Sequence, residues 1–536
     1  MTDARPPLSR TISQVLALDP SAQALEYGGR WYSWGDIGAT AQSLAEHVRP
    51  GDRVGVLLRN RPVHVGLVVG LLRAGACLVP INPGRGVDRV AAELGELDLP
   101  ILAGTAEDLD RFLVSGSNGG QIGCEDLGWP VVASGPVVAS GPVVASGPVV
   151  ASGPVVASGP RGGARVGPAT PGGTGSGPPV AVEMLTSGTT GPPKRVPLTY
   201  DTFERVLEGA KYYERTAPTQ PRLRSGVAVI NAPLVHLSGL FRVLQCISDG
   251  RSFCLLERFR VNEWADAVRR HRPATASLVP AALRMVLEAD LDPAELSSIQ
   301  SVVSGTAPLA PEDAEAFMAK YGIPVLISYA ATEFGGGVAG WNLADHRQFW
   351  RAKRGSVGRA HPGCRLRVVD PDYGAELPPD TPGLLEVRAR QLGDGSGWTR
   401  TTDLARIDAD GFVWILGRAD QAIIRGGFKV LPDDVRVALE RDPRVRSAVV
   451  VGRPDARLGA VPVAAAELRD GAGPADAESI LASAARTLAA YEVPVELRIV
   501  EELPRTPSGK VDLAAVAVEL GVELGGHRGP GGAPVR

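Results

Sequence analysis

Glycine, hydroxyl and lysine side chains gather in one short stretch that could hold a phosphate group. Residues 186–194 read Thr-Ser-Gly-Thr-Thr-Gly-Pro-Pro-Lys and directly follow an apolar segment, residues 180–185. Glycines let backbone N–H groups approach an anion closely, the hydroxyls add donors, and Lys194 adds positive charge. The stretch is not a Walker A loop, because no Gly-Lys-Ser/Thr closes it. These residue types suit a triphosphate, although a Gly/Thr loop by itself is more often only a turn.

Three further side chains could do chemistry near such an anion. Glu333 is a hard oxygen ligand of the kind that Mg²⁺ prefers. Lys510 ends a segment, 504–510, that two prolines stiffen, and His236 lies in a Pro-Leu-Val-His-Leu-Ser-Gly turn. Taken singly, each has an ordinary interpretation: a solvated carboxylate, a surface lysine and a core histidine.

Strands and helices that alternate along the chain must position these residues. Residues 52–58 predict a buried strand, 62–73 a helix and 76–81 a second strand, and similar alternation resumes from 180 to about 430. This order is typical of a parallel sheet with helical crossovers. Helices over 431–441 and 476–491 and strands over 446–451 and 461–468 then form a different, α+β pattern.

The whole chain is therefore expected to be an α/β protein with two domains. We expect a large N-terminal domain, 1–418, with wound mixed or parallel sheets, and a smaller mobile α+β domain, 419–518, joined to it by a hinge. Within residues 130–179 the hexapeptide Pro-Val-Val-Ala-Ser-Gly occurs five times, followed by more Gly, Pro and Ser. Such units offer no long side chain to bury, which indicates a low-complexity insert. Residues 519–536 are expected to be a disordered tail.

Composition excludes several classes of function. The net charge of −3 and an aromatic content of 5% argue against a nucleic-acid partner. The longest apolar run, 63–81, contains His64 and Arg73, so no transmembrane segment is expected. The N-terminus does not resemble a secretory signal, and the spacing of the five cysteines fits neither a disulfide framework nor a metal cluster. A cytoplasmic protein with free thiols is expected.

Taken together, the motifs resemble those of the adenylate-forming superfamily, which includes acyl-CoA synthetases and fatty-acid–CoA ligases. The string 186–194 matches every specified position of that family's phosphate loop. The other matching segments follow in family order: 51–54, 73–76, 79–83, 233–239, 304–308, 329–333, 402–404, 410–411, 417–420 and 504–510. Only residues of about 120–179 and the last 16 or so lie outside this resemblance.

The resemblance implies a function and a role for each motif. The chain is expected to use ATP and Mg²⁺ to convert a carboxylic acid to an acyl-adenylate, and then to pass the acyl group to coenzyme A. Catalytic roles fall to Lys510, His236 and Glu333, with Glu333 on the metal. The implied ATP-binding residues are Thr186, Ser187, Gly188, Thr189, Thr190, Gly191, Lys194, Gly305, Thr306, Ala307, Tyr329, Ala330, Thr332, Asp403, Arg418 and Lys510. Asp420 marks the hinge, and Gly427 and Lys429 would contact coenzyme A.

Some positions depart from the family pattern. Ala330 and Thr402 stand where the family usually has glycine, which adds a Cβ near the nucleotide and disfavours positive φ. Thr306 replaces a common glycine near the acyl site. Trp341 and Trp350, in a segment longer than usual, are expected to shape the acyl pocket.

Three alternatives stay open at this point, and one of them is an oxidative, luciferase-like activity that shares the fold and that no residue here excludes. The acyl group could go to the phosphopantetheine of an acyl-carrier protein, or the chain could be a catalytically silent scaffold. Intact Lys510, Glu333 and Lys194 argue against the silent scaffold. The residues do not name the acid, the oligomeric state or the pathway.

Overall fold

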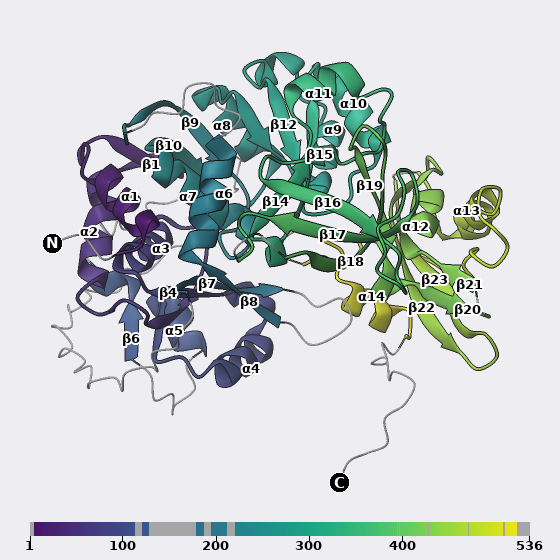
Figure 1. The fold of residues 1–536 in the computed structure, drawn as a ribbon, viewed down its shortest axis with the longest axis horizontal. Coiled ribbons are helices and arrows are strands. Elements are labelled where there is room, and N and C mark those ends of the chain that lie inside the picture. Colours follow the sequence, from purple (N-terminus) through teal and green to yellow (C-terminus); the bar gives the residue numbers. More distant parts are fainter. Residues whose placement is uncertain are drawn as a thin grey trace, which may run out of the picture.

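A computed structural model describes most of the chain (Figure 1). The described residues are 5–112, 120–127, 178–186, 194–211, 220–393, 395, 397–426, 428–469, 471–506 and 510–522. The hexapeptide repeat therefore lies outside them. Among the described residues, no helix combines the length and the apolar character that a membrane crossing requires.

The first sheet contains the strands that the sequence predicts between residues 52 and 81. Its order is β6-β5-β3-β4-β7-β8, and every pair is parallel except β7 with β8. The strands are β3 (Arg53–Leu57), β4 (Cys77–Ile81), β5 (Ile101–Gly104), β6 (Gly120–Gly123), β7 (Val180–Thr186) and β8 (Lys194–Thr199). Helices α3 (Pro62–Ala74), α4 (Val87–Leu97), α5 (Ala106–Phe112) and α6 (Tyr200–Lys211) belong to this part of the chain. The predicted strand–helix–strand unit is confirmed.

A second sheet, of order β2-β1-β10-β9, shares one hydrophobic core with the first. It contains β1 (Gln23–Tyr27), β2 (Arg30–Ser33), β9 (Arg224–Ile230) and β10 (Arg251–Leu255). The neighbouring helices are α1 (Pro7–Leu16), α2 (Trp34–Leu44), α7 (Leu237–Asp249) and α8 (Val261–His271). Leu25 and Phe253, from this sheet, and Val54, from the first, are all fully buried in that core. The two sheets therefore form one packed unit.

A third sheet, β11-β12-β13-β14-β15, carries the predicted adenine and metal motifs. It contains β11 (Thr275–Ser277), β12 (Ser301–Ser304), β13 (Val325–Ala331), β14 (Gly336–Gly340) and β15 (Arg359–Ala360), with helices α9 (Pro280–Glu288), α10 (Pro311–Tyr321) and α11 (Leu343–Phe349). Trp341 and Trp350 are buried in its core, where Trp341 contacts the ring of Phe412. This ring packing gives both tryptophans a structural role, and the expectation that they also shape the acyl pocket stays a prediction.

An antiparallel sheet, β16-β17-β18-β19, ends the large N-terminal part of the chain. Its strands are β16 (Cys364–Val369), β17 (Gly383–Ala389), β18 (Thr399–Ile407) and β19 (Val413–Arg418). The predicted boundary after Arg418 falls at the end of β19. The observed mixture of parallel and antiparallel sheets confirms the expected fold class.

The C-terminal part has its own sheet and its own hydrophobic clusters, at one end of the molecule (Figure 1). Strands β20 (Ile423–Arg425), β21 (Phe428–Val430), β22 (Val445–Asp455), β23 (Gly459–Leu468) and β24 (Leu497–Val500) form the sheet, with helices α12 (Pro432–Glu440), α13 (Ala477–Ala484) and α14 (Leu513–Glu519). The helix predicted over 476–491 ends at Ala484. The Thr487 hydroxyl donates to the Ala484 carbonyl, and such side-chain bonds compete with the helical ladder.

Six short 3₁₀ turns complete the described elements. They are η1 (Pro83–Arg85), η2 (Cys124–Leu127), η3 (Pro293–Leu296), η4 (Thr332–Phe334), η5 (Ala419–Gln421) and η6 (Pro474–Asp476). Two of them matter for the site, because η4 carries Glu333 and η5 carries Asp420.

Candidate functional site

The loop that carries Lys510 is closed by backbone hydrogen bonds. Thr506 N–H donates to the Lys510 carbonyl over 2.7 Å, and Asp512 N–H donates to the Pro504 carbonyl over 2.8 Å. Asp512 also caps α14, since its side chain accepts from the N–H groups of Ala514 and Ala515. These backbone hydrogen bonds hold residues 504–506 beside residues 510–512, at the start of α14.

Lys510 reaches charged groups of the large N-terminal part. Partial burial lowers the pKa of its ammonium group; Glu333 acts in the opposite direction and Arg418 in the same direction. Its side chain nevertheless remains exposed to solvent. Lys510 and Glu333, which are more than 170 positions apart in the chain, thus act on each other electrostatically. The sequence predicted these three residues as parts of one site, and the structure brings them together.

Asp403 and Tyr329 form the centre of a network at the facing ends of β13 and β18. The Tyr329 hydroxyl donates to Asp403, and burial raises the pKa of both groups. Arg418, opposite Asp403 in the β18–β19 register, lies 3.9 Å from the second carboxylate oxygen. That guanidinium also donates to both oxygens of Asp420, over 2.9 and 2.8 Å. Asp403 therefore keeps an oxygen with room for one more donor, which suits a ribose hydroxyl.

His236 stands at the start of α7, in a turn that Asn60 holds. The Asn60 amide accepts from Leu234 N–H over 2.7 Å and donates to the Ala232 and Leu256 carbonyls. Burial lowers the pKa of His236 to about 4, and the Lys510 ammonium acts in the same direction. The imidazole is thus neutral near pH 7. Its Nε2 is buried without a hydrogen-bond partner among the described residues, which leaves it able to meet a bound acid.

Asn60 is a positioning residue that the sequence analysis missed. It is almost fully buried and comes from the loop between β3 and α3, far from the histidine turn in the sequence. A buried side-chain amide is satisfied only when several backbone groups surround it. An asparagine at the end of a predicted buried strand was the one available signal.

Gly305, Thr306 and Ala307 follow β12 and approach β13. A Cβ on Gly305 would lie 2.9 Å from the Ser328 carbonyl, so glycine is required by close packing there. Thr306 has a φ of 72°, which is unusual for a β-branched residue. The hydroxyl oxygens of Ser304 and Thr306 are buried without hydrogen-bond partners in the described part of the chain. Thr306 thus combines backbone strain with an unsatisfied hydroxyl, and Ser304 adds a second one. A bound ligand could supply the hydrogen-bond partners that these hydroxyls lack.

The other two departures from the family pattern carry no such strain. Neither Ala330 nor Thr402 is among the residues with positive φ, and both side chains are exposed. The concern that a Cβ at these two positions conflicts with the backbone is therefore removed. The strained substitution is Thr306.

Replacing Thr306 by glycine is expected to stabilise the protein. A residue with a side chain in the left-handed region costs about 1–2 kcal/mol of backbone strain. Glycine removes this strain, but it loses more conformational entropy on folding, which offsets part of the gain. Thr306→Gly should therefore raise the free energy of unfolding by about 1 kcal/mol. Urea unfolding measures this. Thr306→Ser keeps the hydroxyl and the strain, and should leave stability nearly unchanged. A destabilised Thr306→Gly variant would contradict the strain argument.

Thr186 and Lys194 are the described ends of the phosphate loop. They pair across the antiparallel β7–β8 hairpin, and the Thr186 hydroxyl donates to the Lys194 carbonyl over 3.1 Å. The predicted contacts at Ser187, Gly188, Thr189, Thr190 and Gly191 lie outside the described residues.

Glu333 and the half-buried Thr332 lie on η4, directly after β13. The Glu333 carboxylate is exposed and lines a cavity of about 440 Å³ together with Thr202, Gln391 and residues of β8. An exposed carboxylate beside a cavity and near Lys510 has the donor chemistry that Mg²⁺ requires. The described residues therefore fit a nucleotide with its metal ion.

The predicted coenzyme A contacts belong to the β20–β21 hairpin. Lys429 pairs with Ile424, and Gly426 turns the chain with a φ of 58°. Gly427 itself lies outside the described residues. The hairpin confirms a turn between two strands here and does not test the roles of Gly427 and Lys429.

Ion pairs also join the two parts of the chain, and the sequence analysis missed them. Glu288, at the end of α9, lies 3.6 Å from Arg446 and 3.8 Å from Arg469, both of the C-terminal part. Exposed pairs of this length contribute only about 0–1 kcal/mol each. These ion pairs weakly favour the arrangement of the two parts in which Lys510 lies close to Glu333.

Two family models match this chain, one in each of its two parts. Residues 13–395 match the family model of AMP-binding enzymes, and 436–510 match the model of the AMP-binding enzyme C-terminal domain. The rice (Oryza sativa subsp. japonica) protein 4-coumarate--CoA ligase-like 9 is 30% identical over 90% of this chain and 87% of that protein. Rice 4-coumarate--CoA ligase 1 is 29% identical over 61% of this chain and 60% of its own length.

A solved structure shares the fold. ATP-bound MatB from Rhodopseudomonas palustris superposes with a TM-score of 0.77 at 22% identity, over 95% of this chain and 98% of that one. At this identity the likeness concerns the fold alone. The family models, by contrast, span both the large part that holds Glu333 and the small part that holds Lys510. The chain is therefore a member of the AMP-binding enzyme family.

Proposed function

We propose that this protein activates a carboxylic acid with ATP to give an acyl-adenylate and then transfers the acyl group to the thiol of coenzyme A. The observation that carries the proposal is the position of Lys510. A loop of the C-terminal part brings its ammonium group into the environment of Glu333, Arg418 and His236. The reaction joins two anions, a carboxylate and ATP. A lysine ammonium group close to the predicted nucleotide-binding residues would reduce the repulsion between them.

The first half-reaction needs positioning and charge neutralisation. The acid's carboxylate oxygen attacks the α-phosphorus of ATP, and pyrophosphate leaves. Lys510 would neutralise the charge that builds on the carboxylate and α-phosphate oxygens, while neutral His236 holds the carboxylate in place. Asp403 would accept from the ribose, Tyr329 would contact the adenine, and Arg418 would contact ribose or phosphate.

Magnesium is proposed to bind at Glu333. The ion would neutralise charge on the phosphates when bound, a contribution that needs a hard oxygen ligand at this place. Lys194 and the hydroxyls of residues 186–190 would hold the remaining phosphate oxygens. Gly305, Thr306, Ala307, Ala330 and Thr332 would line the nucleotide and acyl side.

The second half-reaction requires a different arrangement of the two parts. The thiolate sulfur of coenzyme A attacks the acyl carbon, AMP leaves, and the thiol proton goes to solvent. We assign Asp420 to the hinge between domains 1–418 and 419–518. Its bidentate contact with Arg418, and the contacts of Glu288 with Arg446 and Arg469, are the ion pairs that such a rotation would exchange.

The decisive experiment is ATP–pyrophosphate exchange over a panel of aromatic, short, medium and long-chain acids, followed by thioester formation with and without coenzyme A. We expect exchange with at least one acid class and turnover that coenzyme A accelerates. If no acid supports exchange, the proposed activation is overturned. If exchange occurs and only a phosphopantetheine-bearing carrier protein accepts the acyl group, the acceptor is wrong and the first step stands. A role in fatty-acid metabolism and a cytoplasmic location remain predictions.

A substitution at Gly427 separates the two half-reactions. If the glycine borders the thiol path, Gly427→Leu should leave pyrophosphate exchange within about threefold and reduce thioester formation by about 100-fold, because a side chain would fill space that a bound ligand needs. Gly473→Leu is the matched control in the same part of the chain, since a Cβ there has no atom within 4 Å. An equal loss in both half-reactions would make Gly427 structural.

A further inference from the structure

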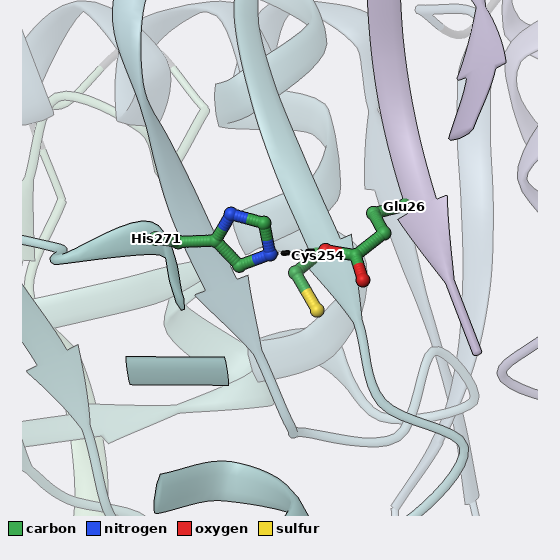
Figure 2. Close-up of side chains that lie close together, drawn as sticks. All are labelled: Glu26, Cys254 and His271. Atoms are coloured by element: carbon green, nitrogen blue, oxygen red, sulfur yellow. Dashed lines mark hydrogen bonds and ion pairs between the residues drawn. The ribbon is translucent and has the colours of Figure 1, made fainter. Parts of the chain in front are cut away.

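Three side chains with metal-ligand chemistry meet in the large N-terminal part of the chain, in a cluster that contains none of the predicted nucleotide residues. Glu26, Cys254 and His271 offer a carboxylate oxygen, a thiol sulfur and an imidazole nitrogen that all lie within 4.8 Å of one another (Figure 2). Glu26 and Cys254 are almost fully buried, and the His271 side chain is 9% exposed. The spacing of the cysteines gave no sign of this, because the other two donors are not cysteines and Glu26 lies more than 200 residues before Cys254.

The fold explains why these three residues meet. Strands β1 and β10 are parallel neighbours, and Glu26 lies directly opposite Cys254 in their register. Residues opposite each other project to the same face of a sheet. Helix α8 follows β10 and ends at His271, so the imidazole comes from the last turn of that helix. The negative end of the helix dipole favours a cation at this position.

Both oxygens of the Glu26 carboxylate contact neighbouring side chains. Arg270 donates to Oε1 of Glu26, while Oε2 faces Nε2 of His271. Arg270 also pairs with Asp266 over 2.8 Å, so its charge is already balanced outside the cluster. Outer partners of this kind orient a ligating carboxylate in metal sites.

We propose that Glu26, Cys254 and His271 bind a zinc ion that ties β1, β10 and α8 together. Thiolate, imidazole and carboxylate are the ligand types of protein zinc sites, at about 2.3, 2.0–2.1 and 2.0–2.2 Å respectively. Three protein ligands leave the fourth tetrahedral position for water. The direct contact between Nε2 and Oε2 must open by rotation of these side chains to admit the ion.

The charges balance when the ion binds. Cys254 gives its thiol proton to solvent and becomes a thiolate, so Glu26 and Cys254 together carry two negative charges against the two positive charges of Zn²⁺. Burial, together with the Glu26 carboxylate, raises the pKa of the free thiol to about 12. Metal must therefore displace that proton, and affinity should rise with pH. In the absence of metal the same residues form a hydrogen-bonded ion-pair cluster.

The test uses the whole chain, purified and treated with a chelator, then titrated with Zn²⁺ or Co²⁺. We expect about one metal ion per chain by elemental analysis, a thiolate-to-cobalt charge-transfer absorption with Co²⁺, and a Tm that rises by several degrees with Zn²⁺. The Cys254→Ala variant should lose the absorption band and the Tm shift. His271→Gln should weaken binding by at least about tenfold, as loss of one ligand does.

A second cysteine gives the matched control. Cys246, on α7, is also buried, and it is not part of the cluster. Cys246→Ala should keep both the absorption band and the Tm shift. The proposal is overturned if the wild-type chain binds no Co²⁺ with thiolate absorption, or if Cys254→Ala and the wild type respond to metal alike. ATP–pyrophosphate exchange is measured in parallel to confirm that each variant is folded. The proposed metal site does not require the proposed activity, so the result of the metal titration stands apart from it.

Discussion

Lys510→Ala should abolish most of the ATP–pyrophosphate exchange while leaving thioester formation from a supplied acyl-adenylate nearly unchanged. The ammonium group is the cation that the C-terminal part brings to Glu333 and His236, so its loss removes stabilisation from the first half-reaction alone. Removal of one preorganised donor at a site of developing charge costs about 10²–10³ in rate. We expect a fall of that size in exchange and a change of less than about threefold in the second half-reaction.

A distant lysine controls for the loss of charge. Lys320 pairs with Asp290 on the surface over 2.5 Å, and exposed pairs contribute at most about 1 kcal/mol. Lys320→Ala should therefore leave both half-reactions intact. Wild-type exchange in Lys510→Ala would show that the arrangement of the two parts seen here is not the one that forms the adenylate.

Gly239→Ala should damage both stability and activity, although it adds a single methyl group. A Cβ at Gly239 would lie 2.2 Å from the Pro233 carbonyl oxygen and 2.7 Å from that of Ala232, and both are backbone atoms. The turn that carries His236 must then move. Forced overpacking costs about 1–3 kcal/mol, and a shift of about 1 Å at a reacting group costs about 100-fold in rate.

The comparison variant for Gly239 is Gly209→Ala, on α6. Gly209 has no atom within 4 Å of the added Cβ and no positive φ. Alanine is favoured over glycine inside a helix by about 1 kcal/mol, so Gly209→Ala should raise Tm slightly and leave exchange unchanged. Urea unfolding and pyrophosphate exchange, measured on both variants, separate a local clash from a general effect of Gly→Ala. Equal behaviour of the two variants would contradict the argument.

The motifs were readable from the sequence because they depend on local geometry. Glycines, prolines and hydroxyl residues set backbone conformation within a few positions, so residues 186–194 and 504–510 were identifiable without neighbours. The strand–helix–strand order over 52–81 was predictable for the same reason, since hydrophobic periodicity is a local signal. Helix ends were less predictable: α13 stops at Ala484, where a side-chain hydrogen bond competes with the ladder.

The departures from the family pattern could not be judged without backbone angles. Ala330, Thr402 and Thr306 looked alike as replacements of glycine, yet only Thr306 has positive φ. Likewise, the aromatic residues of 334–354 suggested a ligand pocket, and the structure shows that Trp341 packs on Trp350 and Phe412 in the core. The reason is that backbone strain and side-chain burial depend on contacts with residues far away in the sequence, which local sequence patterns do not reveal.

The sequence by itself determined the type of chemistry, through the phosphate loop, the Glu333 and Lys510 motifs and the two-part α/β organisation. The tertiary structure decided which of these residues meet. It brought Lys510 to Glu333 and Arg418, gave the His236 turn its support in Asn60, and placed Glu26 beside Cys254 and His271. Lys510 with Glu333, Asn60 with Leu234, and Glu26 with Cys254 are each more than 170 residues apart. Such contacts arise from strand register and from the packing of separate hydrophobic cores, which no local pattern encodes.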